Sequence, residues 1–324
     1  MPETRYGKAL NQALSDALEA NDAVTLIGED IAAHGGSFGV TRGLLDRFGP
    51  DCVRDTPISE ATLIGAAVGA AISGLRPVVE IMFMDFLTLG MDALVNQAAK
   101  ARFMFGAQCS VPMVVRTPHG GGISAGPQHS QCLEAWLVHM PGLKVVCPAT
   151  PEDAYALMRA AIEDPDPVVV VENKALYAMK GELADDPAKV GIGEARIARS
   201  GGDATVVTYG GMLYTALDAA QELAAEGVEV EVIDLRSLQP WDEKTVLASL
   251  SRTHRVVVCH EAVEAFGIGA EIVARLADVG FDELDAPPIR VGAPFMPVPF
   301  SKALEDRHRP GSDAVVAAVR RALA

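Results

Sequence analysis

The sequence predicts an α/β protein built from two doubly wound domains, each a parallel sheet with helices on both faces. Short apolar runs alternate along the chain with segments of helical periodicity. The apolar runs are continuous, which is typical of strands that are covered on both faces of a parallel sheet. A length of 324 residues favours two domains over one.

The elements of the first half follow in chain order. Leucines spaced four residues apart predict an amphipathic helix over 6–20, and the apolar run 24–28 predicts a strand that ends in a polar loop. Ser59 is a preferred N-cap for the helix predicted over 59–74, which is rich in Ala and Gly. The other predicted elements are strands at 53–55, 76–82, 113–116, 143–147 and 168–171, and helices at 85–105 and 151–163.

The pattern weakens after residue 172, and a second alternating series begins at residue 204. Turn-forming composition between them predicts a linker, so we expect domains at 1–185 and 204–324, joined by residues 186–203. The predicted elements of the second domain are strands at 205–209, 228–235, 256–259 and 289–291, and helices at 213–226, 242–250, 268–277 and from 313 onward.

Charge and composition exclude several classes of function. The chain has 27 Lys and Arg against 43 Asp and Glu, and its net charge of −16 disfavours binding to nucleic acid or to anionic membranes. The five cysteines are odd in number and form no C-x-x-C pair, so free thiols are expected. The N-terminus shows no signal-peptide pattern, and the uncharged run 61–75 is shorter than the about 20 residues that span a bilayer. These observations predict a soluble, cytoplasmic protein.

Several catalytic motifs are incomplete. Residues 122–126 fit the G-x-S-x-G pattern of serine hydrolases, but a nucleophile elbow needs a strand before it and a helix after it, and Pro127 follows at once. Gly267 and Gly269 lack the third glycine of a dinucleotide-binding fingerprint, and no P-loop motif occurs. An isolated His-x-x-Cys pair lacks the further ligands of a zinc site.

Three residues remain as candidates for chemistry, each with a structural alternative. Glu60 opens a helix after the strand 53–55, at the carboxyl edge where parallel sheets bind ligands, or it only complements the helix dipole. His129 follows a glycine-rich loop, residues 119–126, and is either a catalytic group or a structural hydrogen-bonding residue. Phe86, near a helix start, is by default a core residue.

A series of motifs in fixed order extends through the whole chain. It comprises Thr56-Pro57-Ile58-Ser59-Glu60, Gly65 with Gly69, Arg76-Pro77, Asn96-Gln97-Ala98-Ala99-Lys100, Gln128-His129-Ser130-Gln131, Pro141-Gly142-Leu143-Lys144-Val145-Val146, Asp166-Pro167-Val168, Glu172-Asn173-Lys174 with Leu176-Tyr177, and Asp234-Leu235-Arg236-Ser237-Leu238 with Pro240 and Glu261. This series closely resembles the beta subunit of the thiamine-diphosphate-dependent 2-oxo acid dehydrogenases, the decarboxylating first component of those multienzyme complexes. The pyruvate and acetoin types look nearest, and the branched-chain type is somewhat further.

The resemblance implies a thiamine-diphosphate pyrimidine-binding domain followed by a transketolase C-terminal-like domain. It implies that Glu60 hydrogen-bonds a pyrimidine ring nitrogen and favours the imino tautomer, which generates the nucleophilic ylid. The cofactor then carries the chemistry of decarboxylation. The ring of Phe86 would stack on the pyrimidine, and Glu29 would be a second acid nearby. Ile58 and Met82 would be apolar walls of this site.

The resemblance also implies a second catalytic residue and a cation site. His129 would handle protons when the lipoyl dithiolane is reductively acylated. A structural monovalent cation, usually potassium, would be held by backbone carbonyl groups and one side chain. The implied ligands are the carbonyls of Met113, Ala161, Ile162 and Asp164 and the side chain of Asp166, where many relatives have Asn.

One motif of the family is absent. Thiamine-diphosphate enzymes hold Mg²⁺ and the diphosphate at a G-D-G motif, and no Gly-Asp-Gly occurs in this sequence. We therefore expect an alpha subunit that brings this half of the site, an α2β2 heterotetramer, and a lipoyl acyltransferase as the next component. The alternatives are a branched-chain 2-oxo acid dehydrogenase beta subunit, a split transketolase-like enzyme of ketol transfer, and a non-catalytic scaffold. Retention of Glu60, Phe86 and His129 together argues against the scaffold.

Overall fold

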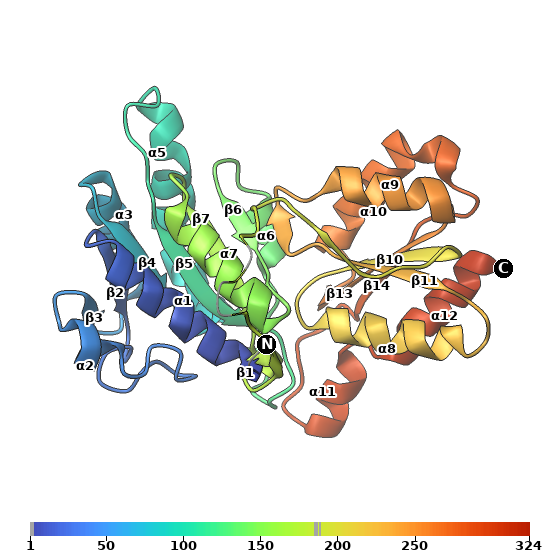
Figure 1. Cartoon of the computed structure of the whole chain (residues 1–324), viewed down its shortest axis with the longest axis horizontal. Helices are drawn as coiled ribbons and strands as arrows, with labels where there is room; N and C mark the ends of the chain where they lie inside the picture. Colours follow the sequence, from blue (N-terminus) through green and yellow to red (C-terminus); the bar gives the residue numbers. More distant parts are fainter. Residues whose placement is uncertain (1–2, 185–186, 188) are drawn as a thin grey trace. The chain divides into compact units, whose positions relative to one another are not determined.

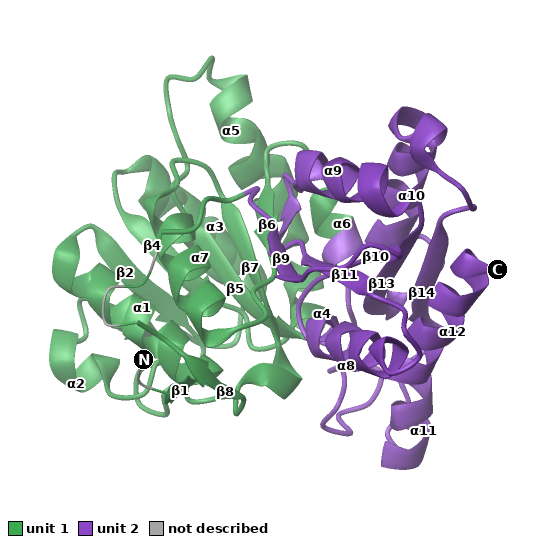
Figure 2. Cartoon of the chain, turned by 45° about the vertical axis from the view of Figure 1, so that its right-hand side comes forward, with its two compact units in different colours: residues 1–119, 136–192 green, residues 120–135, 193–324 purple. Residues whose placement is uncertain are grey.

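The chain forms two compact units, which Figure 2 distinguishes by colour. The computed structural model describes residues 3–184, 187 and 189–324. Unit 1 comprises the chain up to residue 119 together with 136–192, and unit 2 comprises 120–135 and 193–324. The first domain predicted from the sequence is continuous and ends at residue 185, which lies outside the described residues. In the structure, the segment 120–135 belongs instead with the C-terminal part of the chain.

Unit 1 is built on parallel strands in the order β6-β7-β5-β4-β2-β3. Their bounds are β2 (Val24–Gly28), β3 (Val53–Asp55), β4 (Arg76–Glu80), β5 (Val114–His119), β6 (Lys144–Val146) and β7 (Val168–Asn173). Every residue of β5 and β7 is buried, as expected for strands covered on both faces. A separate antiparallel pair joins β1 (Glu3–Arg5) to β8 (Lys180–Glu182).

The helices of unit 1 follow the predicted periodicity where it is strongest. Helices α1 (Tyr6–Ala20) and α7 (Pro151–Glu163) have the predicted bounds and pack side by side (Figure 1). Helix α3 (Glu60–Ile72) begins where expected, but the Ser59 hydroxyl donates to Thr62 Oγ1 at 2.7 Å and does not cap the helix. The remaining short elements are α2 (Leu44–Phe48), α6 (Glu134–Val138) and the 3₁₀ turn Lys174–Leu176.

The single helix predicted over 85–105 is wrong. The segment consists of α4 (Met84–Leu87), a 3₁₀ turn (Thr88–Gly90), a π-helix (Ala93–Ala98) and α5 (Ala99–Met104). Gly90 packs directly on α3, and a Cβ atom there would lie 2.4 Å from Ile64 Cδ1. This close approach accompanies changes of helical pitch, since 3₁₀ and π turns alter the residues per turn.

Unit 2 contains a five-stranded sheet in the order β14-β13-β10-β11-β9, in which only the edge strand β9 is antiparallel to its neighbour. The strands are β9 (Arg196–Arg199), β10 (Ala204–Thr208), β11 (Val230–Asp234), β13 (Val256–Val263) and β14 (Ile289–Ala293), with the short strand β12 (Ser237–Gln239) outside this sheet. The β9 residues, predicted to be linker, are therefore part of the second sheet. Both sheets with their helices confirm the α/β fold class.

Helices cover both faces of this second sheet. Figure 1 shows α9 and α10 above it and α8 and α12 below it. The helices are α8 (Met212–Ala224), α9 (Glu243–Thr253), α10 (Ile268–Val279), α11 (Lys302–His308) and α12 (Ser312–Leu323), with a 3₁₀ turn at Phe281–Glu283. None of the helices in the described ranges is long and apolar enough to cross a membrane.

A buried ion network lies in the core of unit 1. Arg116 on β5 is 2% exposed, and its guanidinium contacts the carboxylates of both Glu80 and Glu172. Its Nε donates to Glu172 Oε1 at 2.8 Å, and the Tyr177 hydroxyl donates to Glu172 Oε2 at 2.6 Å. Burial raises the pKa of Glu80, although the charge of Arg116 opposes that rise. One guanidinium thus compensates two carboxylates that have no access to solvent.

Candidate active site

Three neighbouring strands of unit 1 end at one edge of the sheet, where the candidate residues follow them. Gly28, the last residue of β2, is in register with Asp55 of β3 and Glu80 of β4. Glu29 follows β2 directly, and Glu60 begins the helix that follows β3. Ligands of open α/β sheets bind at the carboxyl ends of the strands. The register therefore gathers two acidic side chains at the edge where a ligand is expected.

The two carboxylates share one electrostatic environment. Glu29 is 4% exposed and Glu60 is 6% exposed. Burial raises the pKa of Glu29, the charges of Glu60 and Asp30 raise it further, and a hydrogen bond from the Ser59 amide opposes the rise. That amide donates to Glu29 Oε1 at 3.0 Å. The Glu60 charge is thus one cause of the raised pKa of Glu29, and neighbouring acids of this kind are typical of sites that move protons.

Glu60 itself is the most informative residue of this edge. Within the described parts of the chain its carboxylate forms neither a hydrogen bond nor an ion pair, although it is almost fully buried. Its oxygens are not among the buried atoms that lack a partner, so they keep some access to solvent, and a ligand that enters here can replace water as the hydrogen-bond donor. A ring nitrogen that carries a proton would be a suitable donor. The residue therefore fits the pyrimidine of thiamine diphosphate.

Apolar side chains complete the same edge. Met82 and Phe86 follow β4 and are both half-buried, and the Phe86 ring lies edge-to-face against Phe83 with centroids 5.7 Å apart. Ile58 is 80% exposed, which is unusual for an isoleucine beside a buried acid. Flat and apolar surfaces of this kind suit an aromatic heterocycle. These three residues, with Glu29 and Glu60, all belong to unit 1.

His129 is placed differently from the other candidates. It lies in the segment 120–135, which belongs to unit 2, and its side chain is half-buried. Its amide donates to the carbonyl of Gly126 at 3.3 Å, so a tight turn connects it to the glycine-rich loop. The structure therefore groups five of the six predicted cofactor-site and catalytic residues in unit 1 and assigns the sixth to unit 2.

Three of the five predicted potassium ligands, Ile162, Asp164 and Asp166, contact basic side chains. Arg76 Nη1 donates to the carbonyl of Ile162 at 2.7 Å and to that of Asp164 at 3.2 Å. Lys144 Nζ lies 2.6 Å from a carboxylate oxygen of Asp164. The Asp166 carboxylate pairs with Arg102 at 2.9 Å, and the Met113 carbonyl accepts from the amide of Val168. Arg76, Lys144 and Arg102 therefore already contact the oxygen atoms of this cluster. A potassium ion at this place stays a prediction.

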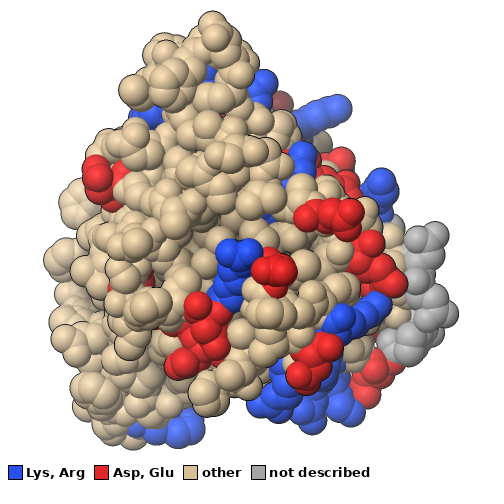
Figure 3. Space-filling model, turned by 90° about the vertical axis from the view of Figure 1, so that its left-hand side faces the viewer, with Lys and Arg blue, Asp and Glu red and all other residues tan. Residues whose placement is uncertain are grey.

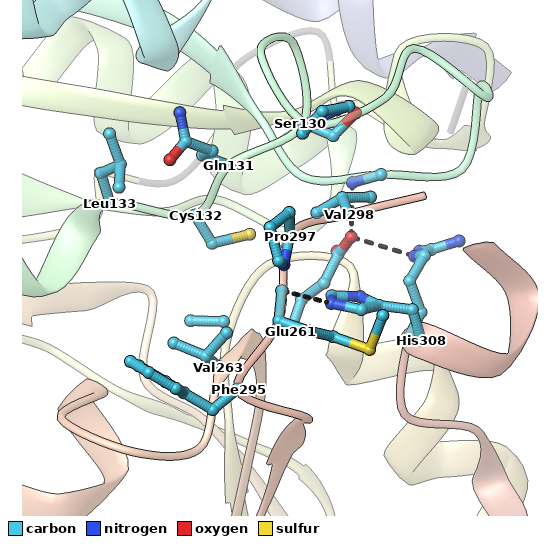
Figure 4. A pocket seen from close by; sticks show the side chains of 15 residues that line it. Ser130, Gln131, Cys132, Leu133, Glu261, Val263, Phe295, Pro297, Val298 and His308 are labelled. Carbon is cyan, nitrogen blue, oxygen red and sulfur yellow. Dashed lines mark hydrogen bonds and ion pairs between the residues drawn. The ribbon is translucent and has the colours of Figure 1, made fainter. Parts of the chain in front are cut away.

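Two buried acids of unit 2 are Glu261, which the sequence singled out only as part of the motif series, and Glu305, which it did not single out at all. They hold the backbone of the glycine-rich loop, and Glu261 also lines a cavity of about 320 Å³ (Figure 4). Figure 4 shows residues of the segment 130–133 on one side of this cavity and Phe295 and Pro297 among the residues facing them. The glycine content of the loop indicates an unusual backbone conformation in the sequence. It does not indicate which acidic side chains hold that backbone.

Comparison with known proteins agrees with the two-domain division. The family model described as "Transketolase, pyrimidine binding domain" matches residues 3–180, and "Transketolase, C-terminal domain" matches residues 193–315. The solved structure named "Split gene transketolase, inactive beta4 tetramer" has the same fold, with a TM-score of 0.81 over 98% of this chain and 97% of that chain at 24% identity. The fold and the two family models thus define a transketolase-like protein with a pyrimidine-binding domain.

Curated relatives narrow the family. The chain is 46% identical to the "Acetoin:2,6-dichlorophenolindophenol oxidoreductase subunit beta" of Bacillus subtilis (strain 168), over 95% of this chain and 94% of the relative. It is 44% identical to the "Pyruvate dehydrogenase E1 component subunit beta-2, mitochondrial" of Oryza sativa subsp. japonica, over 99% of this chain and 86% of the relative. The chain belongs to the family of pyruvate and acetoin dehydrogenase E1 beta subunits.

Proposed function

We propose that this chain is the beta subunit of a 2-oxo acid dehydrogenase of the pyruvate or acetoin type. Together with an alpha subunit it catalyses oxidative decarboxylation of a 2-oxo acid and transfers the acyl group to lipoamide. The carriers of this proposal are Glu29 and Glu60, which follow β2 and β3 at the carboxyl edge of the sheet of unit 1. Thiamine diphosphate, when bound, supplies the nucleophilic carbon that attacks the 2-oxo group and accommodates the electrons left by carbon dioxide.

The residues of this chain would act on the pyrimidine half of the cofactor. Glu60 would accept a hydrogen bond from the protonated ring nitrogen, and Glu29, whose pKa is raised by burial and by the Glu60 charge, would be a second acid nearby. Phe86 would stack on the ring, and the apolar side chains of Met82 and Ile58 would exclude water from it. His129 would deliver a proton to the lipoyl sulfur during acyl transfer.

A partner subunit completes the proposal. The chain has no Gly-Asp-Gly motif, so we assign Mg²⁺ and the diphosphate to an alpha subunit in an α2β2 heterotetramer. Figure 3 shows a side of the molecule on which acidic and basic side chains are sparse over a wide area. Exposed apolar residues on α5 and just after it support a protein partner, since Phe103 is 90% exposed and Met104 is 65% exposed.

A lipoyl acyltransferase, a cytoplasmic location and a structural potassium ion are further parts of the proposal.

The isolated chain should bind thiamine diphosphate weakly and show no decarboxylation. The physical reason is that the Mg²⁺-diphosphate anchor is absent from this sequence. Isothermal calorimetry of the purified chain, with and without Mg²⁺, measures the binding. The chain coexpressed with an alpha subunit that carries a G-D-G motif is the positive control and should bind tightly only with Mg²⁺. Tight, Mg²⁺-dependent binding to the isolated chain would contradict the shared site.

His129→Ala should reduce acyl transfer to lipoamide more strongly than decarboxylation measured with an artificial electron acceptor. The acceptor removes electrons without any proton transfer to a lipoyl sulfur, whereas lipoyl reduction needs a group that exchanges protons near neutral pH. Both assays use the reconstituted heterotetramer. Equal losses in the two assays, with an unchanged melting temperature, would disprove the specific proton-transfer role.

A ketol-transferring split transketolase is the second candidate function. Its fold is shared, as the solved structure shows. The relatives at 44–46% identity over nearly the whole chain are instead acetoin and pyruvate dehydrogenase subunits. Release of carbon dioxide from a 2-oxo acid, measured alongside transfer between sugar phosphates, distinguishes the two functions directly.

A further inference from the structure

A buried carboxylate on α11 holds two amides of the glycine-rich loop of unit 2. Glu305 Oε1 accepts a hydrogen bond from the Gly122 amide at 2.9 Å, and Oε2 accepts one from the Ser124 amide at 2.9 Å. The Ser124 hydroxyl lies 3.4 Å from Oε2. Both oxygens of one side chain are therefore used to fix two alternate residues of the loop.

The loop amides also stabilise the buried carboxylate of Glu305. Its side chain is 0% exposed, and no basic side chain among the described residues forms an ion pair with it. A buried charge without compensation is strongly unfavourable. Here the donors come from backbone amides, whose hydrogen bonds to an ionised acceptor are stronger than those between neutral groups. The carboxylate and the loop therefore stabilise each other.

The backbone of the loop is shaped to receive an anion. Gly120 and Gly122 have φ angles of 84° and 97°, and Ser124, which is not glycine, has a φ of 57°. Left-handed residues that alternate in this way turn successive amides toward one point, which forms an anion-binding concavity. A serine at positive φ is strained and persists only where its surroundings hold it. The two hydrogen bonds of Glu305 provide that restraint.

A second carboxylate reinforces the first. Glu261 Oε1 accepts from the Gly121 amide at 2.6 Å and from Arg309 Nε at 2.9 Å, and Figure 4 shows the contacts of this carboxylate as dashed lines. The amide of Arg309 in turn donates to the carbonyl of Glu305 at 3.0 Å. Glu261 on β13 and Glu305 on α11 therefore hold the amides of Gly121, Gly122 and Ser124 between them, and Arg309 links the end of α11 to Glu261.

The same C-terminal segment also fixes the end of the loop nearest to His129. Gly126 packs on the Phe300 ring so closely that a Cβ atom would lie 2.3 Å from it. The carbonyl of Gly126 then accepts the hydrogen bond from the His129 amide. Contacts from residues 300–309 therefore extend along the loop to the turn that carries the histidine.

We propose that Glu305 is a positioning residue for His129: its buried carboxylate fixes the loop 120–126, and so fixes the turn from which the histidine acts. The proposal rests on the proposed function, since it assigns a catalytic purpose to this loop. Glu305 lies far from His129 in the sequence, and under this proposal it contributes to the acyl-transfer step by holding the loop before the histidine. Glu305 itself makes no contact with substrate in this scheme.

Glu305→Gln tests the proposal in the reconstituted heterotetramer. Glutamine has nearly the same shape, but its amide group offers one acceptor oxygen and places an N–H against an N–H of the loop. We expect amide exchange of the peptide 119–131, followed by hydrogen–deuterium exchange mass spectrometry, to become about tenfold faster. Acyl transfer to lipoamide should fall about tenfold, whereas decarboxylation with an artificial acceptor should change less than about twofold.

Two further variants make the outcome decisive. Asp306→Asn removes the neighbouring acid of the same helix, which pairs with exposed Lys302, and should change neither the exchange nor either assay. Glu305→Asp keeps the charge and withdraws the oxygens, so it should alter exchange and transfer in the same direction by a smaller factor. This variant decides the question if the glutamine variant fails to fold.

The proposal is overturned if loop exchange in Glu305→Gln equals that of the wild type. It is also overturned if the loop opens but both assays fall equally at an unchanged melting temperature, because the loop would then have no specific link to acyl transfer. Failure of the proposed function has a different signature, namely a wild-type heterotetramer that releases no carbon dioxide from any 2-oxo acid. Loop exchange reports on Glu305 independently of that result.

Discussion

Glu60→Gln should lower decarboxylation by the reconstituted heterotetramer about a hundredfold, which is the usual contribution of a positioned acid–base group. Glutamine keeps the volume of the side chain, but its neutral amide cannot stabilise a protonated ring nitrogen as a carboxylate does. The steady-state rate with an artificial electron acceptor measures the effect, because this assay does not involve the lipoyl step. Cofactor binding should change much less than the rate.

The chain offers a matched control for the alternative that Glu60 only complements a helix dipole. Helices α3 and α7 each have 13 residues, and Glu152 lies in the first turn of α7 as Glu60 does in α3. Glu152→Gln should therefore cost about 0.3–1 kcal/mol of stability and leave the rate unchanged. If Glu60→Gln behaves in the same way, the catalytic role is refuted and the dipole role is supported.

The same variant has a consequence for Glu29. The charge of Glu60 is one of the causes that raise the pKa of Glu29, after burial. Removal of that charge should lower the pKa of Glu29 toward its ordinary value. Carbon-detected NMR titration of the Glu29 carboxyl group can follow this change in the unliganded chain, without any reliance on enzyme activity.

Arg116→Met should destabilise unit 1 by about 3–5 kcal/mol, the range found when one partner of a buried ion pair is removed. Methionine fills much of the volume but leaves Glu80 and Glu172 buried without their cation. Urea unfolding monitored by far-ultraviolet circular dichroism measures the loss. Arg102→Met, which removes an exposed pair with Asp166, is the control and should cost less than about 1 kcal/mol.

The loss of stability in Arg116→Met should also depend on pH. Burial raises the pKa of Glu80 in the native chain, and Arg116 opposes that rise. Without the guanidinium, Glu80 takes up a proton more readily in the folded state than in the unfolded state. A group with a raised folded pKa stabilises the fold at low pH and loses that contribution as pH rises. The variant should therefore be closer to the wild type at about pH 5 than at about pH 8, and a pH-independent difference would contradict this account.

The elements that depend on local patterns could be predicted from the sequence, and those that depend on distant contacts could not. Helices α1 and α7 have the expected bounds because their apolar periodicity is strong enough to define them alone. The break near Gly90 depends on a close approach to Ile64 of another helix, which no local pattern records. Strand β9 likewise exists because it pairs with β11, some thirty residues further along the chain.

The residues of the candidate site also include some that the sequence predicts and some that it does not. Glu60 could be selected because it follows a strand and opens a helix, which places it at a sheet edge in any parallel α/β fold. Glu305 could not be selected, because it is one of 43 acidic residues and nothing in its neighbourhood indicates burial. Its partner Gly122 lies 183 positions away in the sequence. Only the folded chain brings these two groups into contact.

The inclusion of residues 120–135 in unit 2 has a consequence for synthesis on the ribosome. Gly122 leaves the ribosome 183 residues before Glu305. At the usual 5–20 residues per second, the glycine-rich loop waits roughly 10 to 40 s for the carboxylate that holds it. While unit 1 folds, the loop between β5 and β6 therefore lacks the hydrogen bonds from Glu305. Chains cut before residue 300 should keep the acidic edge at Glu60, yet expose the loop to proteases, so nascent-chain digestion should cleave near residue 122 until α11 emerges.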